Sequence, residues 1–270
     1  VIVVSALIDR SPLVLLTGLG AMTAVILLIF KDTILSLVAS VQLTSLDMVR
    51  VGDWLEMPQY NADGDVIDVA LHTVTVQNWD KTITTIPTHR LISESYKNWR
   101  AMSESGGRRI KRSIDIDISS VRFLTDDEVQ RFEAFTLLRE YVARKRAELT
   151  KYNVALEGPD SAKVNLRRLT NLGTFRAYIW SYLRNHPEIH RDMTLLVRQL
   201  QPGDTGIPIE IYCFTSTTEW AAYEDIQADI FDHILAQCGE FDLRVFQALS
   251  GADVKARLTG PSANFGAKDP

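Results

Sequence analysis

The chain has 270 residues, with 29 lysines and arginines against 34 aspartates and glutamates, a net charge of −5 and 46% hydrophobic residues. This composition argues against a strongly basic nucleic-acid binder and a disordered chain, and two cysteines do not make a disulfide-stapled secreted miniprotein. The charge is uneven, because Asp9, Arg10, Lys31 and Asp32 are the only charged residues before position 47. We therefore expect a lipid-facing segment joined to a soluble body long enough for two domains.

The first predicted element is an apolar helix over residues 13–30, which contain no charged side chain. A helix of this length spans about 27 Å, close to the thickness of the hydrocarbon core of a bilayer. A buried core helix of a soluble protein is the alternative, but the charged flanks favour a membrane span. Because the chain begins at Val1 inside another apolar run, we expect further hydrophobic sequence before it.

Small residues on one face of this helix indicate close packing. Thr17, Gly20, Ala21, Ala24 and Leu28 recur at steps of three or four residues and so share a face. Small residues let helix backbones approach closely in lipid. The pattern predicts either packing against another helix or, repeated around a symmetry axis, the lining of a narrow apolar tube.

A second, amphipathic helix is predicted over residues 33–46. A single straight helix through both segments would be about 50 Å long, more than a bilayer core requires. Lys31 and Asp32 are poorly suited to hydrocarbon. We therefore predict a kink at these two residues, with 33–46 along the interface and a membrane region covering 1–46.

Residues 47–100 are predicted to form a small, barrel-like β-domain. Apolar residues alternate over short runs, and the hairpin connecting 74–77 to 82–86 turns at residues 79–81. Asp63-Gly64 is interpreted as a tight turn, and Pro87 is expected to end a strand.

Residues 101–250 are predicted to form an α+β domain, followed by a flexible tail over 251–270. Strands are expected over 109–118, 193–197, 207–214 and 243–249. Helices are expected from a capping box at Thr125 and Glu128 to about Leu149, over 173–183, and from a second capping box at Ser216 and Glu219 to about Cys238.

No pattern in the sequence indicates an enzyme, a metal site or a cofactor. His186 and His190 flank Glu188 but have no third ligand placed by spacing, so an exposed turn is favoured. Asp115 and Asp117 are interpreted as a polar strand face, and Cys213 and Cys238 as reduced thiols, the former in the core. Basic clusters at 108–112 and 144–146 are read as solvated faces, with attraction of anionic lipid or ions as the alternative.

Three motifs give the chain a family resemblance. Residues 36–41 (SLVASV) resemble the "NLAAGV" stretch that follows the pore-helix break of the small-conductance mechanosensitive channel family. Residues 49–54 (VRVGDW) are similar to the family's entry to its β-domain, and residues 84–89 (TTIPTH) to its "IPN" motif. Beyond residue 121 the match weakens, and the chain resembles the miniconductance subgroup of enteric bacteria.

The resemblance implies a membrane protein in which a kinked transmembrane pore helix precedes a small all-β domain and an α+β cytoplasmic domain. It implies a homo-heptamer of identical subunits in the bacterial inner membrane, opened by bilayer tension to release ions and solutes in hypo-osmotic shock, without nucleic acid. Alignment through residues 36–41 places the two apolar rings of the gate at Ala24 and Leu28.

The chain departs from the family pattern in three places. Lys31-Asp32 stands where the family has Gln-Gly, Ala24 stands where the outer ring has Leu, and Thr88 stands where the motif has Asn. These changes leave the bend without a glycine hinge and the gate with a smaller outer ring. A membrane-tethered scaffold, whose helix only anchors a partner-binding body, is the competing hypothesis, and it predicts no current under suction.

Overall fold

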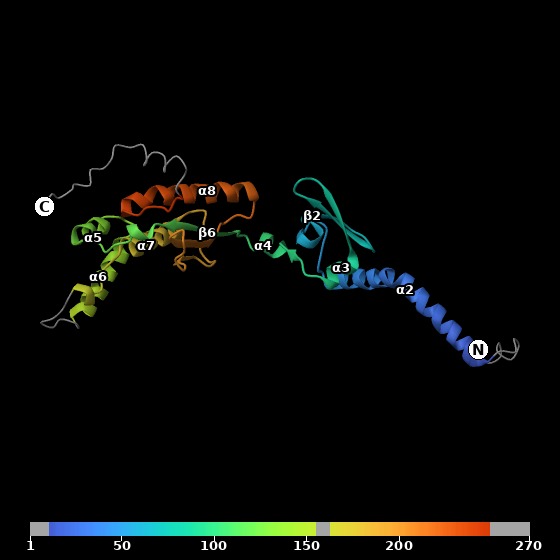
Figure 1. Cartoon of the computed structure of the whole chain (residues 1–270). Coiled ribbons are helices and arrows are strands. Elements are labelled where there is room, and N and C mark those ends of the chain that lie inside the picture. Colours follow the sequence, from blue (N-terminus) through green and yellow to red (C-terminus); the bar gives the residue numbers. More distant parts are fainter. Residues whose placement is uncertain (1–10, 155–162, 249–270) are drawn as a thin grey trace, which may run out of the picture. The chain divides into compact units, whose positions relative to one another are not determined.

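A computed structural model describes residues 11–154 and 163–248 of the chain (Figure 1). The predicted tail from Gly251, the charged flank Asp9-Arg10 and the end of the last predicted strand lie outside these ranges. The chain divides into two compact units, Val1–Ser105 and Gly106–Pro270.

The first unit begins with a single long helix, α2 (Pro12–Ser45, 34 residues). The Ser11 hydroxyl caps its start by accepting a hydrogen bond from the Leu13 N–H at 3.3 Å, and Pro12 occupies the first turn, where its missing N–H costs nothing. The chain between residues 21 and 51 contains neither Gly nor Pro. Nothing in that stretch ends a helix, so α2 continues to Ser45.

The kinked helix predicted over 13–30 and 33–46 is one continuous helix in the structure. Lys31 and Asp32 lie inside α2, and both are exposed. Figure 1 shows the ribbon of α2 changing direction along its length while remaining helical. The role of Lys31 and Asp32 in such a bend stays a prediction.

The β-domain is a five-stranded antiparallel sheet in the order β4-β3-β2-β1-β5. Its strands are β1 (Trp54–Met57), β2 (Ala62–Val69), β3 (Thr73–Asn78), β4 (Ile83–Pro87) and β5 (Lys97–Asn98). The helix η1 (Pro58–Tyr60) joins β1 to β2, α3 (Thr88–Ser93) lies between β4 and β5, and α4 (Arg100–Glu104) follows β5. Alternate residues of β1, β2 and β3 are buried, so each strand places one face in the core. The predicted β-domain and its β3–β4 hairpin are confirmed.

Asp63 and Gly64 do not form the predicted turn. They lie within β2, and the chain reverses instead at η1, where Asn61 adopts a left-handed φ of 52°. Gly64 is required by close approach of β3, because a Cβ there would lie 2.0 Å from the Gln77 carbonyl oxygen. The same residue type serves turns and close strand contacts, so the sequence did not distinguish them.

The second unit is an α+β domain built on the antiparallel sheet β6-β8-β7. Its strands are β6 (Arg109–Ile116), β7 (Leu196–Gln199) and β8 (Ile207–Phe214), and its helices are α5 (Asp126–Glu133), α6 (Arg139–Val154), α7 (Asn171–Asn185) and α8 (Trp220–Gln237), with η2 (Ile118–Ser120), η3 (Lys163–Asn165) and η4 (Cys238–Phe241). The alternating strands and helices confirm the predicted class.

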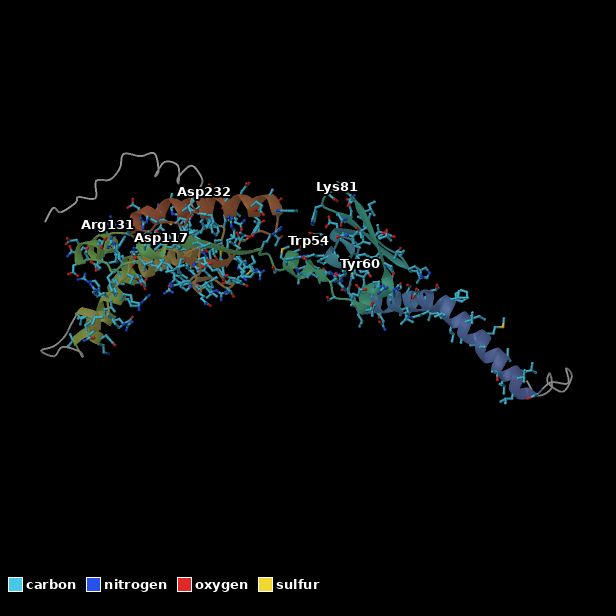
Figure 2. All side chains as sticks on the ribbon, viewed as in Figure 1. Trp54, Tyr60, Lys81, Asp117, Arg131 and Asp232 are labelled. Carbon is cyan, nitrogen blue, oxygen red and sulfur yellow. The ribbon has the colours of Figure 1, made fainter. Side chains whose placement is uncertain are left out.

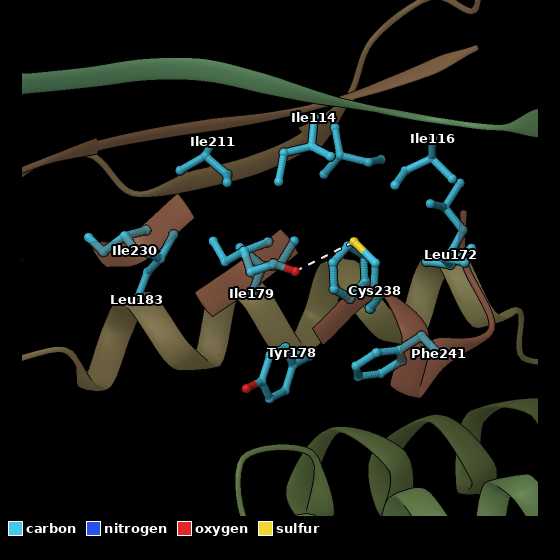
Figure 3. Close-up of a cluster of buried hydrophobic side chains, with 14 of the residues drawn as sticks. Ile114, Ile116, Leu172, Tyr178, Ile179, Leu183, Ile211, Ile230, Cys238 and Phe241 are labelled. Carbon is cyan, nitrogen blue, oxygen red and sulfur yellow. Dashed lines mark hydrogen bonds between the residues drawn. The ribbon is translucent and has the colours of Figure 1, made fainter. Parts of the chain in front are cut away.

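The core of this unit lies between the sheet and two helices. Figure 3 shows Ile114 and Ile211 of the sheet facing Ile179 of α7 and Ile230 of α8, and all four are buried. Cys238 is buried there as well, and its thiol donates a hydrogen bond of 3.5 Å to the Ile234 carbonyl. Both cysteines are free and buried, so Cys213 is confirmed as a core residue.

The helix predicted from Thr125 to Leu149 is two helices. The capping box at Thr125 and Glu128 is confirmed, but α5 ends at Glu133 and α6 begins at Arg139. In one straight helix Phe132 and Leu138 would point about 120° apart, at about 100° per residue. The break lets both side chains enter the same core, where each is at most 1% exposed.

The chain after α7 differs from prediction in three smaller ways. Glu219 itself caps α8, accepting from the Ala221 and Ala222 N–H groups, so the predicted capping box with Ser216 is wrong. Strand β7 begins three residues later and ends two residues later than predicted. Residues 243–248 form an isolated bridge between Val245 and Ile116 instead of a strand.

Candidate pore-lining helix and its junction with the β-domain

The helix α2 can cross a membrane by length and composition, and no other helix in the described residues passes that test. Its most apolar window has a mean hydropathy of 2.6, and none of that window is buried. Figure 2 shows the side chains of its N-terminal part projecting on all sides of the ribbon. A helix that is apolar all round needs either lipid or protein around it.

The predicted pore residues lie on one exposed face of α2. Thr17, Gly20, Ala21 and Ala24 are exposed, and Leu28 is 73% exposed. The Thr17 hydroxyl donates a hydrogen bond of 2.7 Å to the Leu13 carbonyl, so this polar group has its partner within the helix. The two glycines, Gly18 and Gly20, have open space where a Cβ would lie. The single chain thus leaves this face without a partner.

Contact with the β-domain begins beyond Lys31. Lys31 and Asp32 are exposed and line a groove of about 420 Å³ between α2 and α3, together with His89 and Arg90. Before these residues α2 is free, and after them it is docked. A helix fixed at only one end bends most easily where its support stops.

One face of the last turns of α2 packs on the β-domain. Ser36, Ala39 and Leu43 are 5%, 3% and 1% exposed, at a helical spacing, while Leu35, Leu37, Val38, Gln42 and Thr44 between and beside them are exposed. Ser36 Oγ and His89 Nδ1 form a hydrogen bond of 3.1 Å that joins α2 to α3. The adjacent Thr88 hydroxyl is buried without a hydrogen-bond partner.

A buried carboxylate fastens the linker after α2. Asp53 is 6% exposed and accepts hydrogen bonds from the Arg50 N–H at 2.8 Å, the Asn98 amide at 2.9 Å and the Arg100 guanidinium at 2.7 Å. Arg100 also donates to the Asp47 carbonyl at 3.1 Å. The segment between α2 and β1 is thereby tied to β5 and α4.

The balance of burial and hydrogen bonds sets the charge of Asp53. Burial raises the pKa of this carboxyl, but the hydrogen bonds from Arg100, Arg50 and Asn98 outweigh it and lower the pKa below its ordinary value. Asp53 is therefore ionised at neutral pH, and its ion pair with Arg100 is permanent under physiological conditions.

Sequence reasoning found part of this junction. Ser36, Asp53 and His89 each stand in one of the three motifs quoted above, but nothing in the sequence pairs Asp53 with Arg100 or His89 with Ser36. These pairs join residues 47 and 53 positions apart. The available signal was a polar residue inside an apolar stretch, as at Ser36, which predicts a partner without identifying it.

The other sequence candidates do not converge on a site. His186 and His190 each accept a hydrogen bond from a backbone N–H two residues later, at 3.3 Å, as turn residues do. Asp117 caps η2 through Ser119. Within residues 11–154 and 163–248 there is no group of three or more His, Cys, Asp or Glu side chains that could hold a metal ion.

Two family models match the chain, and together they span just over half of it. Residues 32–101 match "Mechanosensitive ion channel, beta-domain", and residues 176–245 match "Mechanosensitive ion channel MscS, C-terminal". The first match contains the docked part of α2, the Asp53 network and the whole five-stranded sheet. The chain belongs to the MscS family of mechanosensitive ion channels. The family resemblance stated from the three motifs is confirmed.

Curated members of the MscS family match over most of this chain. The low conductance mechanosensitive channel YnaI of Escherichia coli is 24% identical over 205 residues, which are 76% of this chain and 45% of YnaI. An uncharacterized MscS family protein of Helicobacter pylori is 23% identical over 229 residues, 82% of this chain and 32% of that protein. The chain therefore spans less than half the length of these relatives. The match to YnaI agrees with the predicted likeness to channels of small conductance.

Solved structures share the fold. The wild-type MSL1 of Arabidopsis thaliana has a TM-score of 0.59 at 12% identity, covering 88% of this chain and 65% of that one. The closed MscS of Helicobacter pylori has a TM-score of 0.54 at 12% identity, covering 87% of this chain and 71% of that one. The predicted succession of apolar helix, β-domain and α+β domain is that of the MscS fold.

Proposed function

We propose that this chain is a subunit of an ion channel that membrane tension opens and that releases ions and small solutes in hypo-osmotic shock. The observation that carries the proposal is α2: its first part is apolar, exposed and unpartnered, and its last turns are docked on a β-domain of the MscS family. A membrane anchor alone has no need of a small-residue face.

The gate is formed by Ala24 and Leu28, gathered from identical chains around an axis, which we take to be a homo-heptamer. The two residues are one helical turn apart on the same face, so a ring of α2 helices presents two stacked apolar rings. A narrow apolar constriction loses its water, and an ion that enters loses hydration without compensation. Thr17, Gly20 and Ala21 let neighbouring helices approach closely enough to keep the passage narrow.

Tension acts on this gate through the part of α2 that the β-domain holds. Tension favours the state with the larger area in the membrane plane, and only that difference shifts the equilibrium. Ser36 with His89, and Asp53 with Arg100, fix the end of α2 to the β-domain while the part before Lys31 stays free to tilt. Lys31 and Asp32 are where the bend between these parts is concentrated.

We place the channel in the bacterial inner membrane, with the residues after α2 on the cytoplasmic side. Two observations support this placement: the matching curated relatives are bacterial, and the body after Lys31 is highly charged.

The test is patch recording of the full-length protein in spheroplasts that lack other tension-activated channels. The proposal predicts suction-activated current, and Leu28→Ser is expected to open at lower tension or to leak, because a hydroxyl wets the apolar ring. Ile26→Ser is the matched control, since residue 26 faces about 160° away from residues 24 and 28.

The absence of suction-activated current from protein shown to be in the membrane would overturn the proposal, and would favour a scaffold with a simple anchor. Equal shifts in Leu28→Ser and Ile26→Ser would overturn the assignment of the gate, because they would indicate a general effect of polarity in α2.

A further inference from the structure

A groove in the second unit lies between α6, α7 and β7, far along the chain from α2. It has a volume of about 840 Å³ and is lined by Tyr141 and Arg144 of α6, by Arg176, Trp180 and Arg184 of α7, and by Val197 of β7. This volume is in the range of small-molecule sites. Both family models leave out the stretch 102–175, which contains α6, so this wall of the groove is not a feature that they describe.

Three arginines converge on the groove without a carboxylate partner. In the part of the chain that the structure describes, Arg144, Arg176 and Arg184 form no ion pair, whereas Arg122 and Arg198 of the same unit pair with Glu128 and Glu210. The Arg184 guanidinium donates a hydrogen bond of 2.7 Å to the Arg191 carbonyl. This bond holds the Arg184 side chain in position and leaves its other N–H donors free.

The arginines make the groove positive in a chain that is negative overall. Glu140 is its one acidic lining residue, so the lining carries a net charge of about +2 against −5 for the chain. The positive charge acts on Tyr141: burial raises the pKa of this phenol, and Lys145, Arg176 and Arg144 oppose that rise. Converging unpaired guanidinium groups are typical of sites for phosphate or carboxylate groups.

An exposed tryptophan lies among these arginines. Trp180 is 46% exposed, and in the described residues it makes no ring contact, although Trp54 stacks on Trp99 at 4.6 Å in the other unit. Arg176, Trp180 and Arg184 recur every four residues on the outer face of α7 and therefore form one row. A row of cation, aromatic ring and cation presents a stacking surface between two anion-binding groups.

We propose that this groove binds a mononucleotide, with its base stacked on Trp180 and its phosphates held by Arg144, Arg176 and Arg184. The arginines alone fit any small anion. The exposed indole between two of them selects an anion that carries a flat aromatic group. The inference does not depend on channel activity, because none of these residues belongs to α2 or the β-domain.

The test is calorimetric titration of the full-length protein, purified in detergent, with ADP, with tripolyphosphate and with adenosine. ADP is expected to bind, tripolyphosphate to bind about tenfold more weakly, and adenosine to bind weakest. Tripolyphosphate has no base to stack on Trp180, and adenosine has no phosphate for the arginines. Arg176→Gln and Trp180→Ala should each weaken ADP binding by about tenfold, while Trp180→Phe retains most of it.

Arg168→Gln is the matched control, because Arg168 is an exposed arginine of the same unit whose guanidinium lies over the Phe123 ring at 4.0 Å, outside the groove. It should bind ADP as the wild type does, and circular dichroism should show that all variants fold. No binding of ADP, or equal losses in Arg168→Gln and Arg176→Gln, would overturn the proposal. Tripolyphosphate binding as tight as ADP, insensitive to Trp180→Ala, would overturn it in favour of a simple anion site.

Discussion

At the scale of single residues, a buried carboxylate is stable only when donors replace the water that it loses, and Asp53 has donors from three residues. Asp53→Asn keeps the shape of the side chain but places an amide among hydrogen-bond donors. It also removes the buried counter-charge of Arg100, which is 19% exposed and is left with only the half-exposed Asp47. We expect a loss of about 2–4 kcal/mol in the free energy of unfolding, measured by urea titration in detergent.

Asp47→Asn is the control for that experiment. Asp47 also pairs with Arg100, but its side chain is 48% exposed, and an exposed pair contributes at most about 1 kcal/mol. A loss as large for Asp47→Asn as for Asp53→Asn would show that the surface network, and not the buried ion pair, holds the junction.

Glu128 makes the stability of the second unit depend on pH in the acid range. The hydrogen bond from Arg122 lowers the pKa of Glu128 most, while burial raises it. Hydrogen bonds from Thr125 lower the pKa further, so that it falls from 4.5 to about 2. A carboxyl whose pKa is depressed in the fold contributes stability above its unfolded value and loses it as pH falls through the folded value. The contribution of Glu128 is therefore complete above about pH 5 and is lost between about pH 4.5 and pH 2.

Glu128→Gln isolates this effect, because glutamine keeps the capping box with Thr125 while losing the charge that pairs with Arg122. The difference in unfolding free energy between the wild type and Glu128→Gln should be largest at pH 7 and should shrink towards zero near pH 2. A difference that stays constant over that range would mean that the charge of Glu128 has no part in the stability of the domain.

At the scale of elements, Gly64 determines how closely β2 and β3 can pair. Gly64→Ala would place a Cβ 2.0 Å from the Gln77 carbonyl oxygen, so a strand must shift. We expect the β-domain to lose about 2 kcal/mol or more, seen as a lower denaturation midpoint by fluorescence of its tryptophans. Gly239→Ala has open space for its Cβ and should leave the midpoint unchanged. An unchanged midpoint in Gly64→Ala would show that the two strands are not held in this register.

The sequence predicts best those elements whose pattern of apolar residues runs without interruption from end to end. Strand β8 was predicted with its observed bounds, Ile207–Phe214, because a long apolar run between turn residues has one interpretation. The break between α5 and α6 was not predicted, since it depends on Phe132 and Leu138 sharing a core with Phe241. The face of α2 shared by Ala24 and Leu28 follows from helical spacing alone, whereas the Asp53–Arg100 pair needs the folded β-domain.

At the scale of the whole molecule, α2 requires an environment that a single chain in water does not supply. Large apolar side chains are exposed along it from Leu13 to Val41, far more than a soluble monomer leaves open. Lipid can cover most of this surface, but it gives no reason for small residues to gather on one face. Assembly of identical chains along that face accounts for both observations.

A cysteine introduced at Leu28 should form disulfides between neighbouring chains in membranes treated with a mild oxidant, because a narrow ring brings residues of the pore face together. The thiols of Cys213 and Cys238 will not interfere, because both are buried and burial raises their pKa to about 12 and about 11. Leu28→Cys should therefore run as a covalent dimer on a non-reducing gel, the largest product that one reactive thiol per chain allows. Ile26→Cys, which faces away from the axis, should stay monomeric. Dimers from Ile26→Cys without dimers from Leu28→Cys would place the opposite face of α2 on the axis and remove Ala24 and Leu28 from the gate.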